Sequence, residues 1–109
     1  MTTSTLATSP TARSVAISED TLRVGLSDGR EVSVPLSWYP RLSHAQPRHR
    51  NIWQFIGGGH GIHWPEVDED ISVENLLFGQ PSGEGARSFS RWQEWYEQKI
   101  IEQSDAGST

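Results

Sequence analysis

The chain contains no cysteine among its 109 residues. This absence excludes a disulfide scaffold, a zinc site with thiolate ligands, an iron–sulfur cluster and a cysteine nucleophile. It also fits a reducing compartment, so we expect a cytoplasmic protein. No apolar run approaches the roughly 18 residues that a membrane span needs. The Thr- and Ser-rich start lacks the basic and apolar regions of a signal peptide.

Basic residues are also scarce, with 9 Lys and Arg against 14 Asp and Glu and a formal net charge of −5. This balance argues against a dedicated binder of the nucleic-acid backbone. The charges are nevertheless segregated, because residues 32–65 contain no acid and hold all 4 histidines, whereas acids crowd into residues 66–74. Such a distribution is either neutralised inside the fold or presents a charged binding face.

The length allows one domain with a single core. We expect residues 1–12, which are polar and small, to be a disordered tail, and residues 13–79 to form the domain. The Gly-, Pro- and Ser-containing residues 80–87 are typical of a linker. Residues 88–103 then predict an amphipathic helix, and residues 104–109 a frayed end.

Alternating apolar residues predict strands near residues 15–17, 22–26 and 32–34, with Asp28-Gly29 as a turn. Residues 52–56 and Gly61–Trp64 favour a second hairpin around three glycines. The expected fold class is therefore α+β, with a small antiparallel sheet of about five short strands. Two short helices and the C-terminal amphipathic helix complete it.

The first short helix is predicted after Pro35 and is expected to take Ser37 as its cap. Pro47 can open a further helical turn that runs to Arg50. The second short helix contains Leu76 and Leu77, is capped by Asp70 or Ser72 and stops at Gly79. The acids of residues 68–70 precede this helix, and we expect them to complement its N-terminal dipole.

One stripe of the C-terminal helix is aromatic and apolar, and it is the candidate partner-binding surface: Phe89, Trp92, Trp95, Tyr96 and Ile100. Trp and Tyr are favoured anchors of protein interfaces. The alternative is that the helix folds back and covers an open face of the sheet. The sequence leaves both alternatives open.

Basic residues interleaved with aromatics suggest contacts to nucleic acid or another anion through Arg41, Arg48, Arg50 and Trp53. The alternative is that the aromatics supply the core and the arginines bridge to the acidic segment.

Two histidines, His60 and His63, could join Asp68 or Asp70 in a metal site. Residues three apart on a strand point to opposite faces, however, so this spacing is poor evidence for a shared ion. No nucleotide-binding or hydrolase motif occurs. We therefore expect no metal, no other cofactor and no catalytic residue.

Two motifs carry a family resemblance, WYPRL at residues 38–42 and GIHWPEVDEDISVENLL at residues 61–77. The chain resembles, over about residues 15–79, the small bacterial family of unknown function DUF2442. The resemblance implies a compact α+β domain without established catalytic residues. Members often occur beside a second small protein, in an arrangement suggestive of toxin and antitoxin. Some members carry an added DNA-binding helical domain, but the added part here is too short for a helix-turn-helix.

No functional residues are established for this family. The remaining candidates are therefore chosen because they lie within the two motifs: His63, Trp64, Asp68 and Asp70, together with Arg41. The leading hypothesis is a non-enzymatic protein-interaction or regulatory module, an antitoxin-like partner of a small basic protein. Net negative charge favours such a partner. An RNA- or DNA-binding regulator is the second hypothesis, and a metal-dependent enzyme is the third.

Overall fold

A computed structural model describes residues 10–108, with side chains through residue 103. The predicted tail therefore lies, for residues 1–9, outside the described part. The strands are β1 (Ala12–Ile17), β2 (Thr21–Leu26), β3 (Glu31–Pro35), β4 (Gln54–Ile56), β5 (Gly61–Trp64) and β6 (Glu69–Ser72). The helical segments are η1 (Leu36–Trp38), α2 (Pro40–His44), α3 (Pro47–Arg50), η2 (Gly57–Gly59), α4 (Val73–Phe78) and α5 (Ala86–Ser108).

The first sheet is an antiparallel meander in the order β1-β2-β3. Its second turn is the predicted Asp28-Gly29 turn, in which Gly29 has a φ of 91° that only glycine adopts without strain. In β2, alternate side chains are buried, namely Leu22, Val24 and Leu26. The period-two pattern of the sequence is therefore confirmed as one apolar face turned toward the core.

The second sheet is antiparallel in the order β4-β5-β6, and it gives the fold six strands in two sheets. The prediction was wrong for residues 69–70, because they belong to strand β6 and lie outside the first turn of α4, where only Glu74 is acidic. A tight turn with Asp68 at a φ of 53° returns the chain onto β5, where Glu69 pairs with Trp64. Backbone pairing with a buried strand thus overrides the acidic composition of the segment.

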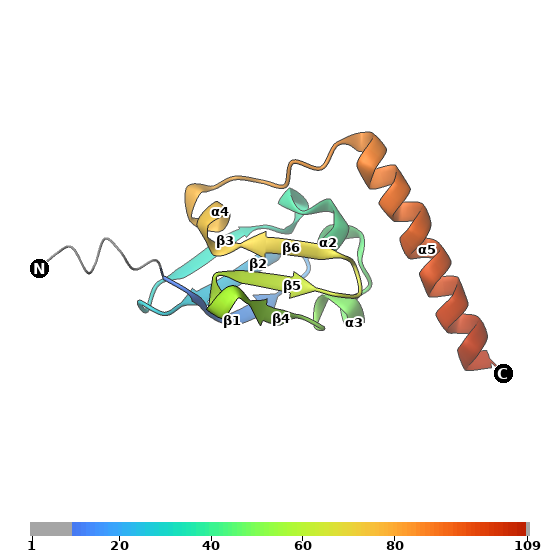
Figure 1. Cartoon of the computed structure of the whole chain (residues 1–109), viewed down its shortest axis with the longest axis horizontal. Coiled ribbons are helices and arrows are strands. Elements are labelled where there is room, and N and C mark those ends of the chain that lie inside the picture. The colour runs from blue at the N-terminus through green and yellow to red at the C-terminus, as the bar shows by residue number, and fades with distance from the viewer. Residues whose placement is uncertain (1–9, 109) are drawn as a thin grey trace, which may run out of the picture.

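The two sheets share one core (Figure 1), in which β2 supplies one wall and β5 and β6 the other. Trp64, Ile62 and Ile71 meet the buried face of the first sheet from the second. Leu36 of η1, Leu42 of α2 and Tyr39 between these two helices belong to the same cluster. This arrangement confirms an α+β domain built on antiparallel pairing.

Helix α4 begins as predicted, because the Ser72 hydroxyl accepts a hydrogen bond from the Asn75 amide at 3.0 Å. It ends at Gly79, which has a left-handed φ of 71°. The predicted cap at Ser37 is wrong, since this residue lies inside η1 and makes no side-chain cap. The residue before η1 is Pro35, whose side chain has no polar atom, so η1 begins without a capping side chain.

The boundaries of the domain and of the last helix differ from the predicted ones. Ala12 is only 5% exposed and starts β1, so it belongs to the domain and not to the tail. Helix α5 covers residues 86–108, which includes the end of the predicted linker and most of the predicted frayed end. The Phe89 amide donates to the Gly85 carbonyl, which closes the first turn earlier than the serine caps suggested.

We expect Ser72→Ala to lower the free energy of unfolding by about 1 kcal/mol, because it removes the acceptor for an N-terminal amide of α4. Urea unfolding measures the change. Ser37→Ala is the matched control, since that exposed serine makes no cap, and it should leave stability nearly unchanged. Equal effects of the two substitutions would contradict the assignment.

Candidate functional site

Helix α5 docks on its own domain through aromatic side chains that carry a polar atom. Trp92 and Tyr96 are both buried, and their rings stack with centroids 4.8 Å apart. The Trp92 indole N–H donates to the Val67 carbonyl at 2.7 Å. An apolar ring with one satisfied donor fixes both the depth and the rotation of the helix.

The Tyr96 hydroxyl links α5 to the start of α3. It accepts a hydrogen bond from the Gln46 amide at 2.9 Å and lies 2.6 Å from Nδ1 of buried His49. Burial lowers the pKa of His49, with the Arg48 charge adding to the effect. The imidazole is therefore neutral near pH 7, and its Nδ1 accepts a hydrogen bond from the Tyr96 hydroxyl.

Further contacts extend along the same face of the helix. His44 meets the rings of Phe89, Trp92 and Tyr96 edge-on at 5.6–6.1 Å. The Lys99 ammonium donates to the Glu66 carbonyl at 2.9 Å and lies 3.2 Å from the Glu66 carboxylate. These contacts lower the pKa of Glu66.

The helix thus folds back onto its own domain, as the alternative held. It packs against α2, α3 and the turn between β5 and β6, however, and not over an open face of the sheet. Of the five predicted partner-binding residues, Trp92 and Tyr96 lie in the core, and Phe89 and Ile100 pack partly buried against it. While α5 is docked, these four cannot serve as a partner surface. Trp95 differs, because 46% of it is exposed.

Arg41 contacts several charged and polar groups near the start of α5. Its guanidinium donates to both carboxylate oxygens of Glu84 at 2.7 and 2.8 Å and to the Asp68 carbonyl at 2.8 Å. The Glu84 hydrogen bonds raise the pKa of Arg41, and Arg41 lowers the pKa of Glu84. The guanidinium also lies 5.9 Å from the Trp92 ring centroid, so Arg41 ties the linker to the domain.

The other candidates for nucleic-acid contact also make intrachain contacts. Arg48 donates to Gln46 at 2.9 Å and to Gln103 of α5 at 3.3 Å. Arg50 donates to the carbonyls of Leu42 and Ser43. Trp53 is partly buried against the core and contacts Phe55. The guanidinium groups of Arg41, Arg48 and Arg50 thus all donate to acceptors within the chain, around α2 and α3.

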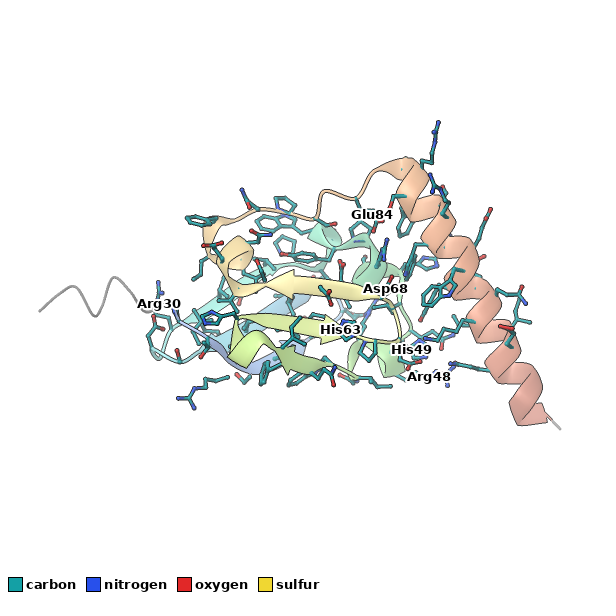
Figure 2. All side chains as sticks on the ribbon, viewed as in Figure 1. Arg30, Arg48, His49, His63, Asp68 and Glu84 are labelled. Carbon is teal, nitrogen blue, oxygen red and sulfur yellow. The ribbon has the colours of Figure 1, made fainter. Side chains whose placement is uncertain are left out.

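Figure 2 shows several of these groups together, because Glu84, Asp68, His49 and Arg48 lie on the side of the domain that faces α5. Arg30 lies at the opposite end, where it pairs with Asp28 at 2.8 Å. The segregated charges of the sequence are therefore partly neutralised within the fold, at the junction with the last helix.

The motif residues of the second sheet have separate roles. His63 on β5 pairs with Asp70 on β6 through its Nδ1, on the outer face of the sheet. Trp64 points inward, is fully buried and donates to the Arg50 carbonyl at 3.0 Å. Asp68 occupies the exposed turn between these strands. Within residues 10–108, no group of three or more His, Asp or Glu residues could hold a metal ion.

Sequence reasoning missed an inward-facing carboxyl group at Glu69. Glu69 lies opposite Trp64 on the core side of the sheet, and burial raises its pKa to about 7 despite the nearby Arg41 charge. Burial also raises the pKa of Tyr39 to about 12, with Glu69 adding to the effect. The buried Tyr39 hydroxyl has no hydrogen-bond partner in the described part of the chain. Assigning residues 69–72 as a strand would have revealed this alternation.

A groove of about 390 Å³ separates the start of α5 from the Asp68 turn. Its walls include Arg41, Asp68, Arg91, Trp92 and Trp95. The exposed Trp95 side chain stands at this groove, and the Lys99 ammonium lies 5.1 Å from its ring centroid. The walls of the groove therefore combine indole rings with charged groups of both signs.

We expect Tyr96→Phe to lower the free energy of unfolding by about 1–3 kcal/mol, because the partly buried Gln46 amide loses its acceptor. Tyr39→Phe is the matched control, since that hydroxyl has no partner and its removal should leave stability equal or higher. Urea unfolding of both variants makes the comparison. A larger loss in Tyr39→Phe would contradict the hydrogen-bond assignment.

Glu69 should make the domain less stable as the pH rises from about 4.5 to about 7. Its folded pKa is raised, so the folded state holds a proton that the unfolded state has released, and stability falls across that window. We expect Glu69→Gln to remove this slope and to raise stability at pH 8 on the order of 2 kcal/mol. Glu94→Gln is the matched control on the exposed side of α5. It should change neither the pH dependence of stability nor the stability at pH 8. Thermal unfolding between pH 4 and pH 8 tests both.

None of the helices within residues 10–108 combines the length and apolarity needed to cross a bilayer. The search of curated proteins found no match to the chain. Among solved structures, the chain is similar to a protein of unknown function from Rhodospirillum rubrum ATCC 11170, with a TM-score of 0.62 and 24% identity. The similarity covers 71% of this chain and 95% of that one. It supports the fold.

A family model described as a protein of unknown function, DUF2442, matches residues 12–82. The match starts at the first residue of β1 and ends in the loop after α4, so helix α5 lies outside it. It confirms the resemblance carried by the motifs around Trp38 and His63. The chain is a member of the DUF2442 family with an additional C-terminal helix.

Proposed function

We propose that the protein is a non-enzymatic interaction module of the bacterial cytoplasm, which binds a basic protein partner through the outer side of α5. The observation that carries this proposal is Trp95, a large aromatic that stays 46% exposed while Trp92 and Tyr96 of the same helix are buried. Exposed tryptophans beside a groove are typical anchors of protein interfaces.

The charge of this surface favours a basic partner. The exposed residues of α5 between positions 91 and 102 are Arg91, Glu94, Trp95, Glu97, Gln98, Ile101 and Glu102. Three glutamates outnumber the single arginine in this set, whereas at the groove Asp68 is balanced by Arg41 and Arg91. Complementary charge would steer a basic protein to this side of the molecule and speed its association.

The arrangement suits an antitoxin-like or regulatory role, in which the chain occupies the surface of a small basic protein. Binding of RNA or DNA receives less support, since the guanidinium groups of Arg41, Arg48 and Arg50 donate to acceptors within the chain. A metal-dependent reaction receives less support as well, because His63 pairs with Asp70 on the outer sheet face.

The test begins with the neighbouring genes, which are inspected for one that encodes a small basic protein. That protein is then co-expressed with this chain, and binding is measured by calorimetry. We expect Trp95→Ala to raise the dissociation constant about tenfold or more, which corresponds to at least about 1.4 kcal/mol. Phe78→Ala is the matched control, because Phe78 is 72% exposed but lies on α4. Added salt should weaken the complex. Equal binding by Trp95→Ala and the unaltered chain would rule out this surface.

A further inference from the structure

The two sheets present four edge strands, and three of them carry features that discourage further pairing. Strand β1 has a bulge near Ser14 and an exposed Arg13. Strand β3 has an exposed glutamate at its start and Pro35 at its end. Strand β6 carries two acids, Glu69 and Asp70. Charges, prolines and bulges are the usual protection of sheet edges against unwanted strand addition.

Strand β4 is short, with three residues, but it carries no charge, proline or bulge. It pairs with β5 on one side, and no strand of residues 10–108 pairs with its other side, which forms the lower edge of the front sheet in Figure 1. All three of its residues are exposed, and Phe55 and Ile56 are 38% and 37% exposed. The flanking Ile52 is exposed too. An open edge with large apolar side chains favours addition of another strand.

Local charge indicates which strand would be added. Residues 51–57 contain no acid, no base and no histidine, in a chain of net charge −5. A basic partner gains no charge complementarity at this neutral edge, unlike at the acidic outer side of α5. A second copy brings the same neutral edge, so residues 51–57 of two acidic chains can meet without placing like charges opposite each other.

We infer that two copies of this chain associate through β4, antiparallel and related by a two-fold axis at Phe55. This inference does not rest on the proposed function. An isologous contact brings the same patch from both subunits together, and an antiparallel strand pair has this symmetry. The two three-stranded sheets become one continuous sheet across the axis.

The register follows from the short length of β4. With Phe55 on the axis, each Phe55 faces its counterpart, and Gln54 faces Ile56 of the other copy. Phe55 lies on the core side of its sheet, opposite Ile62, and its ring is 5.1 Å from that of Trp53. The pair of phenylalanines therefore extends an aromatic cluster that each copy already has, and directly opposed aromatic residues stabilise strand pairs.

Sedimentation velocity over a wide range of protein concentration tests the inference. We expect a monomer–dimer equilibrium in the micromolar range, as a small contact implies. Phe55→Lys should raise the dissociation constant at least tenfold, because two ammonium groups then face each other across the axis. Ser33→Lys is the matched control, since Ser33 is an exposed uncharged residue on the protected edge strand β3, and it should leave the dimer intact.

A charge-pair experiment separates lost pairing from lost folding. Phe55→Lys and Phe55→Glu should each be folded by circular dichroism and monomeric, and an equimolar mixture should regain the dimer, because lysine then faces glutamate. A chain that stays monomeric at every concentration would overturn the inference. The same holds for a Ser33→Lys variant that dissociates as readily as Phe55→Lys, or for a mixture that stays monomeric.

Discussion

The position of the last helix depends on hydrogen bonds made by buried aromatic rings. Apolar burial supplies most of the driving force for docking α5, but it is not directional. The Trp92 indole on the Val67 carbonyl and the Tyr96 hydroxyl on the Gln46 amide each have one geometry. Because the two contacts lie one turn apart on the helix, they fix which side chains turn inward. The exposure of Trp95 follows from this rotation of the helix.

The segregated charges have a structural explanation at the same junction. Arg41 holds Glu84 and the Asp68 turn, Lys99 holds Glu66, and His63 holds Asp70. The histidine- and arginine-rich half of the sequence thus folds against the acidic segment that follows it. The remaining excess of negative charge lies mainly on exposed positions.

Much of the fold could be predicted from local patterns. The alternation of Leu22, Val24 and Leu26, the Asp28-Gly29 turn and the Ser72 cap each follow from backbone geometry within a few residues. Strand β6 could not be predicted in this way, because acids are poor strand formers and its pairing with β5 is a tertiary effect. The start of α5 was missed for a similar reason. The helix begins at Ala86, before the two serines that were expected to cap it, and no capping residue in the sequence marks that position.

The candidate site was harder to predict than the fold. Sequence periodicity placed five residues on one helical stripe, and the stripe exists. Periodicity does not distinguish a helix face that packs on its own domain from one that binds another protein. Trp95 lies at the edge of the stripe, and three-dimensional packing alone decides its exposure. Glu69 was hidden by composition, because a carboxylate within an acidic run is typical of a solvated surface.

Lys99 is the single lysine of the chain, and its amine lies between the Glu66 carbonyl and the face of Trp95. Acylation of this amine would remove the charge that the indole attracts and two of the three donor hydrogens. The side-chain amine chemistry of the protein is therefore concentrated at one contact between helix and domain. A reagent that acylates amines would report, through its rate, how often that end of the helix lifts away.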